Sequence, residues 1–139
     1  MTQEDKDLLL RDICARLPYG VKIALKNNGS YHHENVSKKG DVTIDKLKGF
    51  TGSYFNIYHN NLLDWEWYDD DIDIEDIKPY LFPLSSMTDE EEEEYNTMYE
   101  ENRYSWRENI IDWFNKNHFD YRGLNPKGLA NEATGLNIY

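Results

Sequence analysis

The chain has 139 residues with a hydrophobic fraction of 39%, and twenty of them are Trp, Tyr or Phe. This length suits one domain with an ordinary core, and the aromatic content excludes a disordered acidic tail. The net charge is −12, and no stretch reaches the roughly 18 uncharged apolar residues that a membrane span needs.

The N-terminal residues and the cysteine content indicate a cytoplasmic protein. The chain starts MTQED, which has neither the basic start nor the apolar run of a secretion signal. Cys14 is the single cysteine, so no internal disulfide can form. We expect Cys14 to be a small buried hydrophobe in a reducing compartment.

A helix is predicted over residues 2–17. Thr2 can cap it, and Leu10, Ile13, Cys14 and Leu17 follow the i, i+3, i+4, i+7 spacing of a buried stripe. Pro18 and Gly20 should end this helix.

Short strands follow the first helix. Val21, Ile23 and Leu25 alternate with polar or small residues before an Asn-Asn-Gly turn. Further strands are expected around residues 31–36, at Val42 and Ile44, and over 54–58, 62–68 and 72–77. Pro79 and Pro83 should end the pairing, which leaves 78–84 as an apolar connector.

Two helices are predicted near the C-terminus. Thr88 with Glu91, and Ser105 with Glu108, fit the reciprocal Thr/Ser-x-x-Glu capping pattern. The second helix should bury Trp106, Ile110, Trp113 and Phe114, with Ile111 beside them. After residue 117 an irregular tail follows, and its leucines suggest that it partly docks on the body.

These elements predict an α+β fold in one domain, residues 1–139. An N-terminal helix precedes a five- to six-stranded antiparallel meander or small barrel. Residues 1–84 hold the first helix and the sheet, and 85–139 hold the two C-terminal helices and the irregular tail.

Charge is distributed unevenly. Residues 61–101 contain sixteen acidic residues and a single lysine, Lys78. Phosphate contacts require Lys or Arg, so direct nucleic-acid binding through this acidic face is not expected, whereas a basic protein would be attracted. The candidate partner-binding residues are Asp64, Glu66, Tyr68, Asp69, Asp70, Asp71, Asp73, Glu90, Glu91, Glu93 and Glu94.

Two of these segments have competing interpretations. Trp65 and Trp67 alternate with acidic residues, so they either enter the core or leave one aromatic exposed as an anchor for a partner. The run 90–94 carries about one charge per 1.5 Å of helix, close to the one per 1.7 Å of duplex DNA. Nucleic-acid mimicry is therefore physically possible, and a plain solubilising surface is the simpler interpretation.

The sequence predicts no metal site, no cofactor and no catalytic motif. Asp69, Asp71 and Asp73 have the spacing of a calcium loop, but Ile74 and Tyr80 stand where that loop needs Gly and Glu. His32 and His33 would point to opposite faces of a strand. Phosphate-binding glycine patterns, a nucleophile elbow and paired CxxC motifs are absent from the sequence.

Five segments of the chain are distinctive: ARLPYGVK (15–22), DIKPYLFPLSSMT (76–88), FDYRGL (119–124), KGLA (127–130) and ATGLNIY (133–139). Together they resemble an uncharacterised family of small proteins from gut bacteria and their phages and mobile elements. The resemblance implies a phage or mobile-element context, in which short acidic proteins often bind host proteins. Asn125 and Asn131 depart from the family, which tends to be apolar there, and so does the acidity of residues 64–76.

Three hypotheses for function remain open from the sequence. The first is a non-catalytic binding module that docks on a basic host protein, with nucleic-acid mimicry or inhibition as a possible mode. The second is a small enzyme or ligand binder with a site between the sheet and the helix over 106–114. The third is a structural or assembly component, whose oligomeric state the sequence leaves open.

Overall fold

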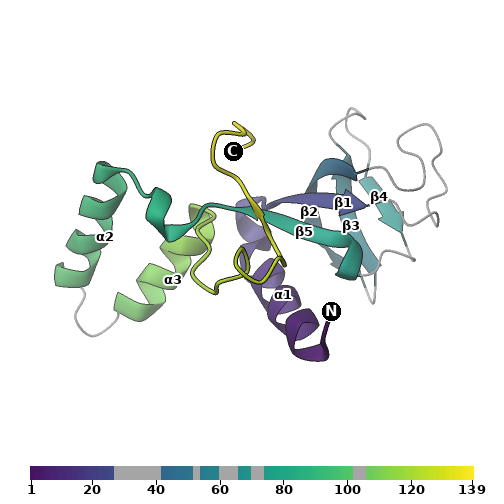
Figure 1. The fold of residues 1–139 in the computed structure, drawn as a ribbon, viewed down its shortest axis with the longest axis horizontal. Helices are drawn as coiled ribbons and strands as arrows, with labels where there is room; N and C mark the ends of the chain where they lie inside the picture. Colours follow the sequence, from purple (N-terminus) through teal and green to yellow (C-terminus); the bar gives the residue numbers. More distant parts are fainter. Residues whose placement is uncertain (27–41, 52–53, 60–65, 70–73, 102–105) are drawn as a thin grey trace.

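The computed structural model describes residues 1–26, 42–51, 54–59, 66–69, 74–101 and 106–139, and the fold is α+β (Figure 1). The helices are α1 (Gln3–Arg16), α2 (Asp89–Glu101) and α3 (Trp106–Lys116), with the 3-10 turns η1 (Leu17–Tyr19), η2 (Ile74–Asp76) and η3 (Leu84–Ser86). The strands are β1 (Lys22–Lys26), β2 (Val42–Thr51), β3 (Tyr54–His59), β4 (Glu66–Asp69), β5 (Ile77–Leu81) and β6 (Asn131–Glu132).

The sheet is open and mixed, so the predicted antiparallel meander or small barrel is wrong. Its strand order is β4-β3-β2-β1-β5-β6. Strands β1 to β4 are adjacent in chain order, whereas β5 pairs with the other edge of β1 and the two-residue β6 adds to β5 in parallel. β4 and β6 therefore end the described sheet without pairing with each other.

The segment 72–84 also differs from its prediction. Ile74–Asp76 forms the turn η2, and β5 begins at Ile77 and continues through Pro79, which lies opposite Ile23 of β1. Proline removes one amide donor, so it costs the ladder at most one hydrogen bond, and its side chain is buried in register with Ile77 and Leu81. Burial of this alternating face outweighs the lost donor. The expected strands at 31–36 and 62–65 lie outside the described residues.

The helix α1 begins as predicted but buries a different stripe. Thr2 caps it in a capping box with Asp5. The buried residues are Leu9, Asp12, Ile13 and Arg16, whereas Leu10 is 41% exposed and Cys14 is exposed. The predicted burial of Leu10 and Cys14 is wrong.

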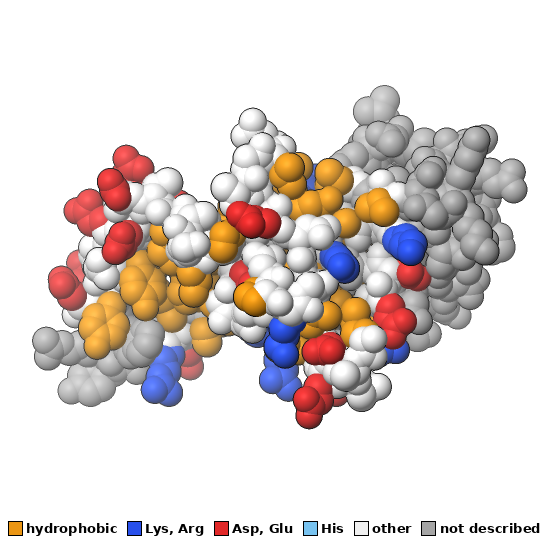
Figure 2. Space-filling model, viewed as in Figure 1, with side chains coloured by type: hydrophobic (Ala, Val, Ile, Leu, Met, Phe, Trp, Pro, Cys, Tyr) orange, Lys and Arg blue, Asp and Glu red, His pale blue; other side chains and the backbone are white. Residues whose placement is uncertain are grey.

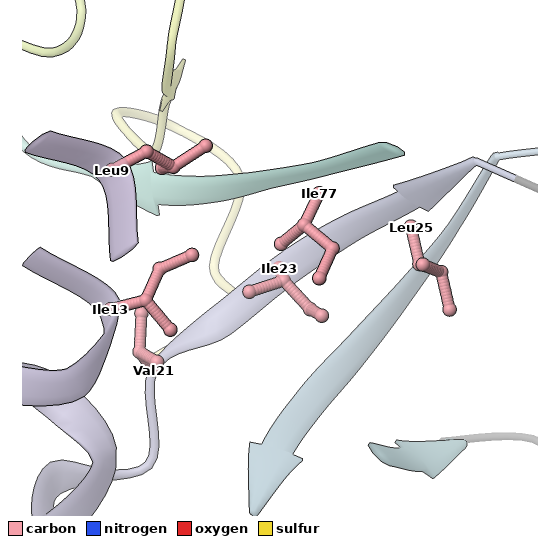
Figure 3. Close-up of a cluster of buried hydrophobic side chains, with 6 residues drawn as sticks. All are labelled: Leu9, Ile13, Val21, Ile23, Leu25 and Ile77. Atoms are coloured by element: carbon pink, nitrogen blue, oxygen red, sulfur yellow. The ribbon is translucent and has the colours of Figure 1, made fainter. Parts of the chain in front are cut away.

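The first core cluster joins α1 to one face of the sheet. Leu9 and Ile13 of α1 lie against side chains of β1, β5 and the residue before β1 (Figure 3). All members are at most 2% exposed, and the sheet contributes Val21, Ile23, Leu25 and Ile77. The alternation of β1 directs Lys22, Ala24 and Lys26 to the opposite face.

A second and a third cluster fix the C-terminal part to the body. Leu81 packs with Leu124, Leu129 and Ala130, while the α3 residues Ile110, Trp113 and Phe114 pack with Phe119. The backbone of Phe82 pairs with the segment 118–120. The Phe82 N–H donates to His118 O (2.9 Å), and the Asp120 N–H donates to Phe82 O (2.8 Å). The tail therefore docks where Leu124 and Leu129 lie, but Leu136 is 48% exposed.

None of the helices in the described part of the chain combines the length and the apolar character that crossing a bilayer requires.

Candidate functional site

The predicted partner-binding residues lie at two ends of the molecule. Glu66, Tyr68 and Asp69 belong to β4 at one end of the sheet, and Glu90, Glu91, Glu93 and Glu94 belong to α2 at the far end (Figure 1). Asp64, Asp70, Asp71 and Asp73, like Trp65, are outside the described residues. The two acidic segments do not form a common surface in the described structure, so the candidate site is built from α2.

Helix α2 forms because its N-terminal half obeys the local rules for a helix start. The Thr88 N–H donates to Glu91 Oε1 (3.0 Å), and the Glu91 N–H donates to Thr88 Oγ1 (3.2 Å), which confirms the predicted capping pattern. Acidic residues in the first turn also interact favourably with the positive end of the helix dipole. Glu91 is therefore part of the N-terminal cap of α2, and its side chain is half-buried.

The carboxylates of α2 point in different directions around the helix. At about 100° per residue, Tyr95 and Met98 face α3, where both pack on the third core cluster. On one side lies what we call the acidic face, formed by Asp89, Glu92, Glu93 and Glu100. Glu90, Glu94 and Glu101 lie together on another side of the helix.

The acidic face adjoins a partly apolar hollow between η3, α2 and α3. This hollow has a volume of about 410 Å³, and Glu92 and Asn96 line both it and the acidic face. Figure 2 shows acidic side chains gathered over α2 with hydrophobic side chains beside them. The hollow is lined by Leu84, Ser85, Met87, Glu92, Tyr95, Asn96 and Phe114.

Charge on α2 is not compensated within the helix. Eight of its 13 residues are acidic and none is basic. Glu100 and Glu101 stand at the C-terminal end, where the helix dipole disfavours negative charge. These two residues therefore lower the stability of α2, which distinguishes them from the acidic residues of the first turn.

A second charged cluster lies buried between α1 and the segment after α3. Arg16 and Asp12 are both fully buried, and Arg16 donates from Nε and Nη2 to the two oxygens of Asp12 at 2.8 and 3.0 Å. Arg16 Nη2 also donates to Phe119 O (2.7 Å), and Arg122 Nη1 donates to Asp12 Oδ1 (2.8 Å). Both guanidinium groups lie over the Tyr121 ring, at 5.5 and 4.5 Å from its centroid.

This cluster, which the sequence analysis missed, is structural. The Asp12 carboxylate accepts three bonds from arginine, which leaves it poorly placed to act as a base. Arg16 fixes α1 to the backbone carbonyls of Phe114 and Phe119, near the end of α3. These buried side chains occupy part of the junction where the sequence suggested an enzyme or ligand site. The i, i+4 spacing of Asp12 and Arg16 is the one local signal for the pair.

His118 and Tyr139 meet beside this cluster. Their rings stack with centroids 3.7 Å apart, and His118 takes a left-handed φ of 60°. Burial, and then the positive charge of Arg16, lower the pKa of His118 to about 4. Its Nδ1 finds no hydrogen-bond partner among the described residues. A neutral imidazole therefore fills this position at neutral pH.

Other sequence candidates carry no site in the described residues. Cys14 is exposed, but the neighbouring protein atoms partly desolvate its thiol and raise the pKa of that thiol, which opposes its use as a nucleophile. No group of three His, Cys, Asp or Glu side chains in the described ranges is placed to hold a metal ion. His32 and His33 lie outside those ranges.

No match was found among protein-family models, among curated proteins or among solved structures.

Proposed function

We propose that the protein is a non-catalytic binding module that docks on a basic host protein through the acidic face of α2. The observation that supports this proposal is the negative charge of α2, which no basic residue within the helix compensates, and which includes Glu100 and Glu101, whose position opposes helix stability. The host assignment rests on the resemblance of several segments to proteins of phages and mobile elements.

The charges and the hollow of this site indicate which side chains a partner segment should carry. Lys or Arg side chains of the partner would pair with Asp89, Glu92, Glu93 and Glu100, and an apolar side chain would enter the adjoining hollow. Each exposed ion pair contributes about 0.2–1 kcal/mol, so affinity also requires the apolar anchor. Leu84, which is 43% exposed, offers apolar surface for that anchor.

The spacing of the carboxylates on the acidic face supports a basic protein as the partner. It does not require that this partner also binds nucleic acid. Asp89 and Glu100 are separated by about 16 Å along the axis, at 1.5 Å per residue. Four carboxylates over this length give about one charge per 4 Å, which is sparser than the one per 1.7 Å of duplex DNA. Competition by DNA therefore tests mimicry as a separate question from docking.

The test compares two variants with the same change in net charge. One carries Glu92→Gln, Glu93→Gln and Glu100→Gln, and its control carries Glu90→Gln, Glu94→Gln and Glu101→Gln. The probe is a fluorescent amphipathic peptide helix with Lys on one face and Leu on the other, measured by anisotropy at about 50 mM salt. We expect the first variant to bind about tenfold more weakly, and the control to bind within about threefold of wild type.

Two results would contradict the proposal. Equal weakening in both variants would show that only net charge attracts the peptide. An affinity that stays constant up to about 1 M salt, where the screening length is about 3 Å, would exclude an electrostatic docking surface. A Leu84→Asn variant tests the anchor, with an expected loss of about threefold in affinity if the hollow is occupied.

A further inference from the structure

A group of lysines lies on the sheet face opposite α1. The cross-strand register places Lys22 opposite Lys46, Ala24 opposite Ile44, and Lys26 opposite Val42. On the other side of β1, Lys78 lies opposite Ala24. Because α1 covers the alternate residues, these side chains share the second face of the sheet. We call Lys22, Lys26, Lys46, Lys78, Ala24, Val42 and Ile44 the lysine face.

The lysine face has an exposed apolar centre. Val42 is 61% exposed and Ile44 is 37% exposed. Both are branched aliphatic residues of the inner strand β2, and Val42 is the first residue of that strand, opposite the last residue of β1. Ala24 is 5% exposed, because its neighbours on β2 and β5 cover it. A shallow hollow of about 280 Å³ includes Ala24, Lys26, Val42 and Lys78.

Lys22 and Lys46 lie opposite each other at one end of this face, and neither forms an ion pair with a carboxylate among the described residues. The same row of the register continues through Tyr58 of β3 to Glu66 of β4. The Lys46 side chain extends past Gly20, where an added Cβ would lie 3.2 Å from its Nζ. The acidic side chains Glu75 and Asp76 line the other end of the face, beside Lys26 and Lys78. Glu75 already pairs with Lys6 at 2.8 Å.

We propose that the lysine face is a second docking surface, which binds an acidic protein segment carrying apolar side chains. Carboxylates of that segment would pair with Lys22 and Lys46, and its apolar side chains would cover Val42 and Ile44. Val42 and Ile44 match the apolar side chains of a protein segment. The register also places Tyr58 and Tyr80 on this face, and tyrosine rings are a surface on which bases stack, so the oligo-dT measurement below decides between the two partners. Charge screening over about 8 Å at physiological salt lets this local patch act despite the net charge of −12.

This surface is independent of the acidic face of α2 and attracts the opposite charge. Figure 1 shows α2 and the sheet at different ends of the molecule. A protein with both surfaces can hold a basic partner and an acidic partner at the same time. The two docking surfaces together would make the protein an adaptor.

The experiment uses the full chain and a labelled amphipathic peptide helix with Glu on one face and Leu on the other. The test variant is Lys22→Gln with Lys46→Gln, and the control is Lys116→Gln with Lys127→Gln, which makes the same change in net charge at exposed sites. By fluorescence anisotropy at about 50 mM salt, we expect the test variant to lose about fivefold in affinity and the control less than twofold. Val42→Asn should lose about threefold.

Each other outcome overturns the proposal. Equal losses in the two lysine variants would mean non-specific attraction, and an unchanged Val42→Asn affinity would mean that the apolar centre is not covered. Stronger binding of single-stranded oligo-dT than of the peptide, lost in the Lys22/Lys46 variant, would identify a nucleic-acid surface instead. Sedimentation showing that the unliganded chain self-associates through Val42 would assign the face to a second copy. Circular dichroism verifies that each variant folds.

Discussion

The charges of the buried cluster around Asp12 are paired with each other, whereas those of the helix α2 are all of one sign. In the cluster, Asp12 and Arg16 are fully buried, and each is held by several hydrogen bonds. In α2, eight acidic residues share one helix with no basic residue, and most are exposed. The first arrangement satisfies its charges internally, whereas the second leaves them for solvent or a partner.

This contrast separates charges that maintain the fold from charges available for binding. A buried pair is costly to break, because removing one partner leaves the other charged in a poorly solvated site. Exposed like charges contribute little to stability, and those at the wrong end of a helix lower it. Substitutions in the buried cluster should therefore lower stability, whereas substitutions of the exposed carboxylates of α2 should weaken binding with little loss of stability.

The largest expected effect comes from breaking the buried pair. Arg16→Met leaves Asp12 buried with Arg122 as its remaining partner among the described residues, and it removes the donors to Phe114 O and Phe119 O. We expect the free energy of unfolding to fall by about 3–5 kcal/mol, measured by urea denaturation. If the pair is coupled, Asp12→Leu combined with Arg16→Met should lose less than the sum of the two single changes. A loss below about 1 kcal/mol would contradict the role of the cluster.

The next effect is a dependence of stability on pH through His118. Its pKa is about 4 in the folded protein against 6.5 for the unperturbed group, so below pH 6.5 the unfolded chain binds a proton that the folded protein does not. Stability should therefore fall as the pH falls from 6.5 to 4, by about 2 kcal/mol, and the loss should level off below that range.

His118→Asn supplies the control for this dependence. Asparagine tolerates the left-handed backbone of residue 118 and does not titrate in this range. The difference between the wild-type and variant curves removes the contribution of the many carboxylates. A difference that does not change between pH 7 and 4 would show that the pKa of His118 is the same in the folded protein and in the unfolded chain.

The sequence predicted the parts of the fold that follow local rules. The capping residues Thr2 and Thr88 are confirmed, as is burial of Ile110, Trp113 and Phe114 on α3. The prediction of the buried side of α1 was partly wrong. The spacing of apolar residues predicted burial of Leu10 and Cys14, whereas the structure buries Asp12 and Arg16. A polar residue can occupy the core when distant groups satisfy it, and those groups lie about a hundred positions away in the chain.

The sheet and the candidate site show the same limit. The lack of an amide donor predicts that Pro79 ends the pairing, yet Pro79 lies inside β5, because long-range packing with β1 outweighs one missing donor. In α2 the sequence predicted a run of acidic residues, but it did not show which of them lie on the same exposed side of the helix. That division depends on which side of the helix packs on α3, and no local pattern of glutamates encodes it.

A smaller effect tests how the last residue is held. The Tyr139 hydroxyl accepts from the Lys22 N–H (2.9 Å) and donates to Tyr80 O (2.8 Å), so it continues the pairing of β1 and β5 beyond Ile23 and Pro79. Tyr139→Phe should lower stability by about 1 kcal/mol. Hydrogen exchange at the Lys22 amide should become faster, while exchange at Leu25 stays unchanged. Unchanged protection of Lys22 would contradict the bridge.

The smallest change in stability should have the opposite sign to all of these. Replacing Glu100 and Glu101 by Lys puts positive charge at the C-terminal end of α2 and relieves repulsion along the helix, so we expect a gain of about 0.5 kcal/mol in urea denaturation. The same variant should bind the Lys/Leu peptide at least tenfold more weakly, because an attractive charge on the acidic face becomes repulsive. Higher stability together with weaker binding would show that Glu100 is placed for a partner rather than for the fold. Lower stability would indicate that these carboxylates have stabilising contacts within the chain, and the contrast with the Asp12 cluster would then fail.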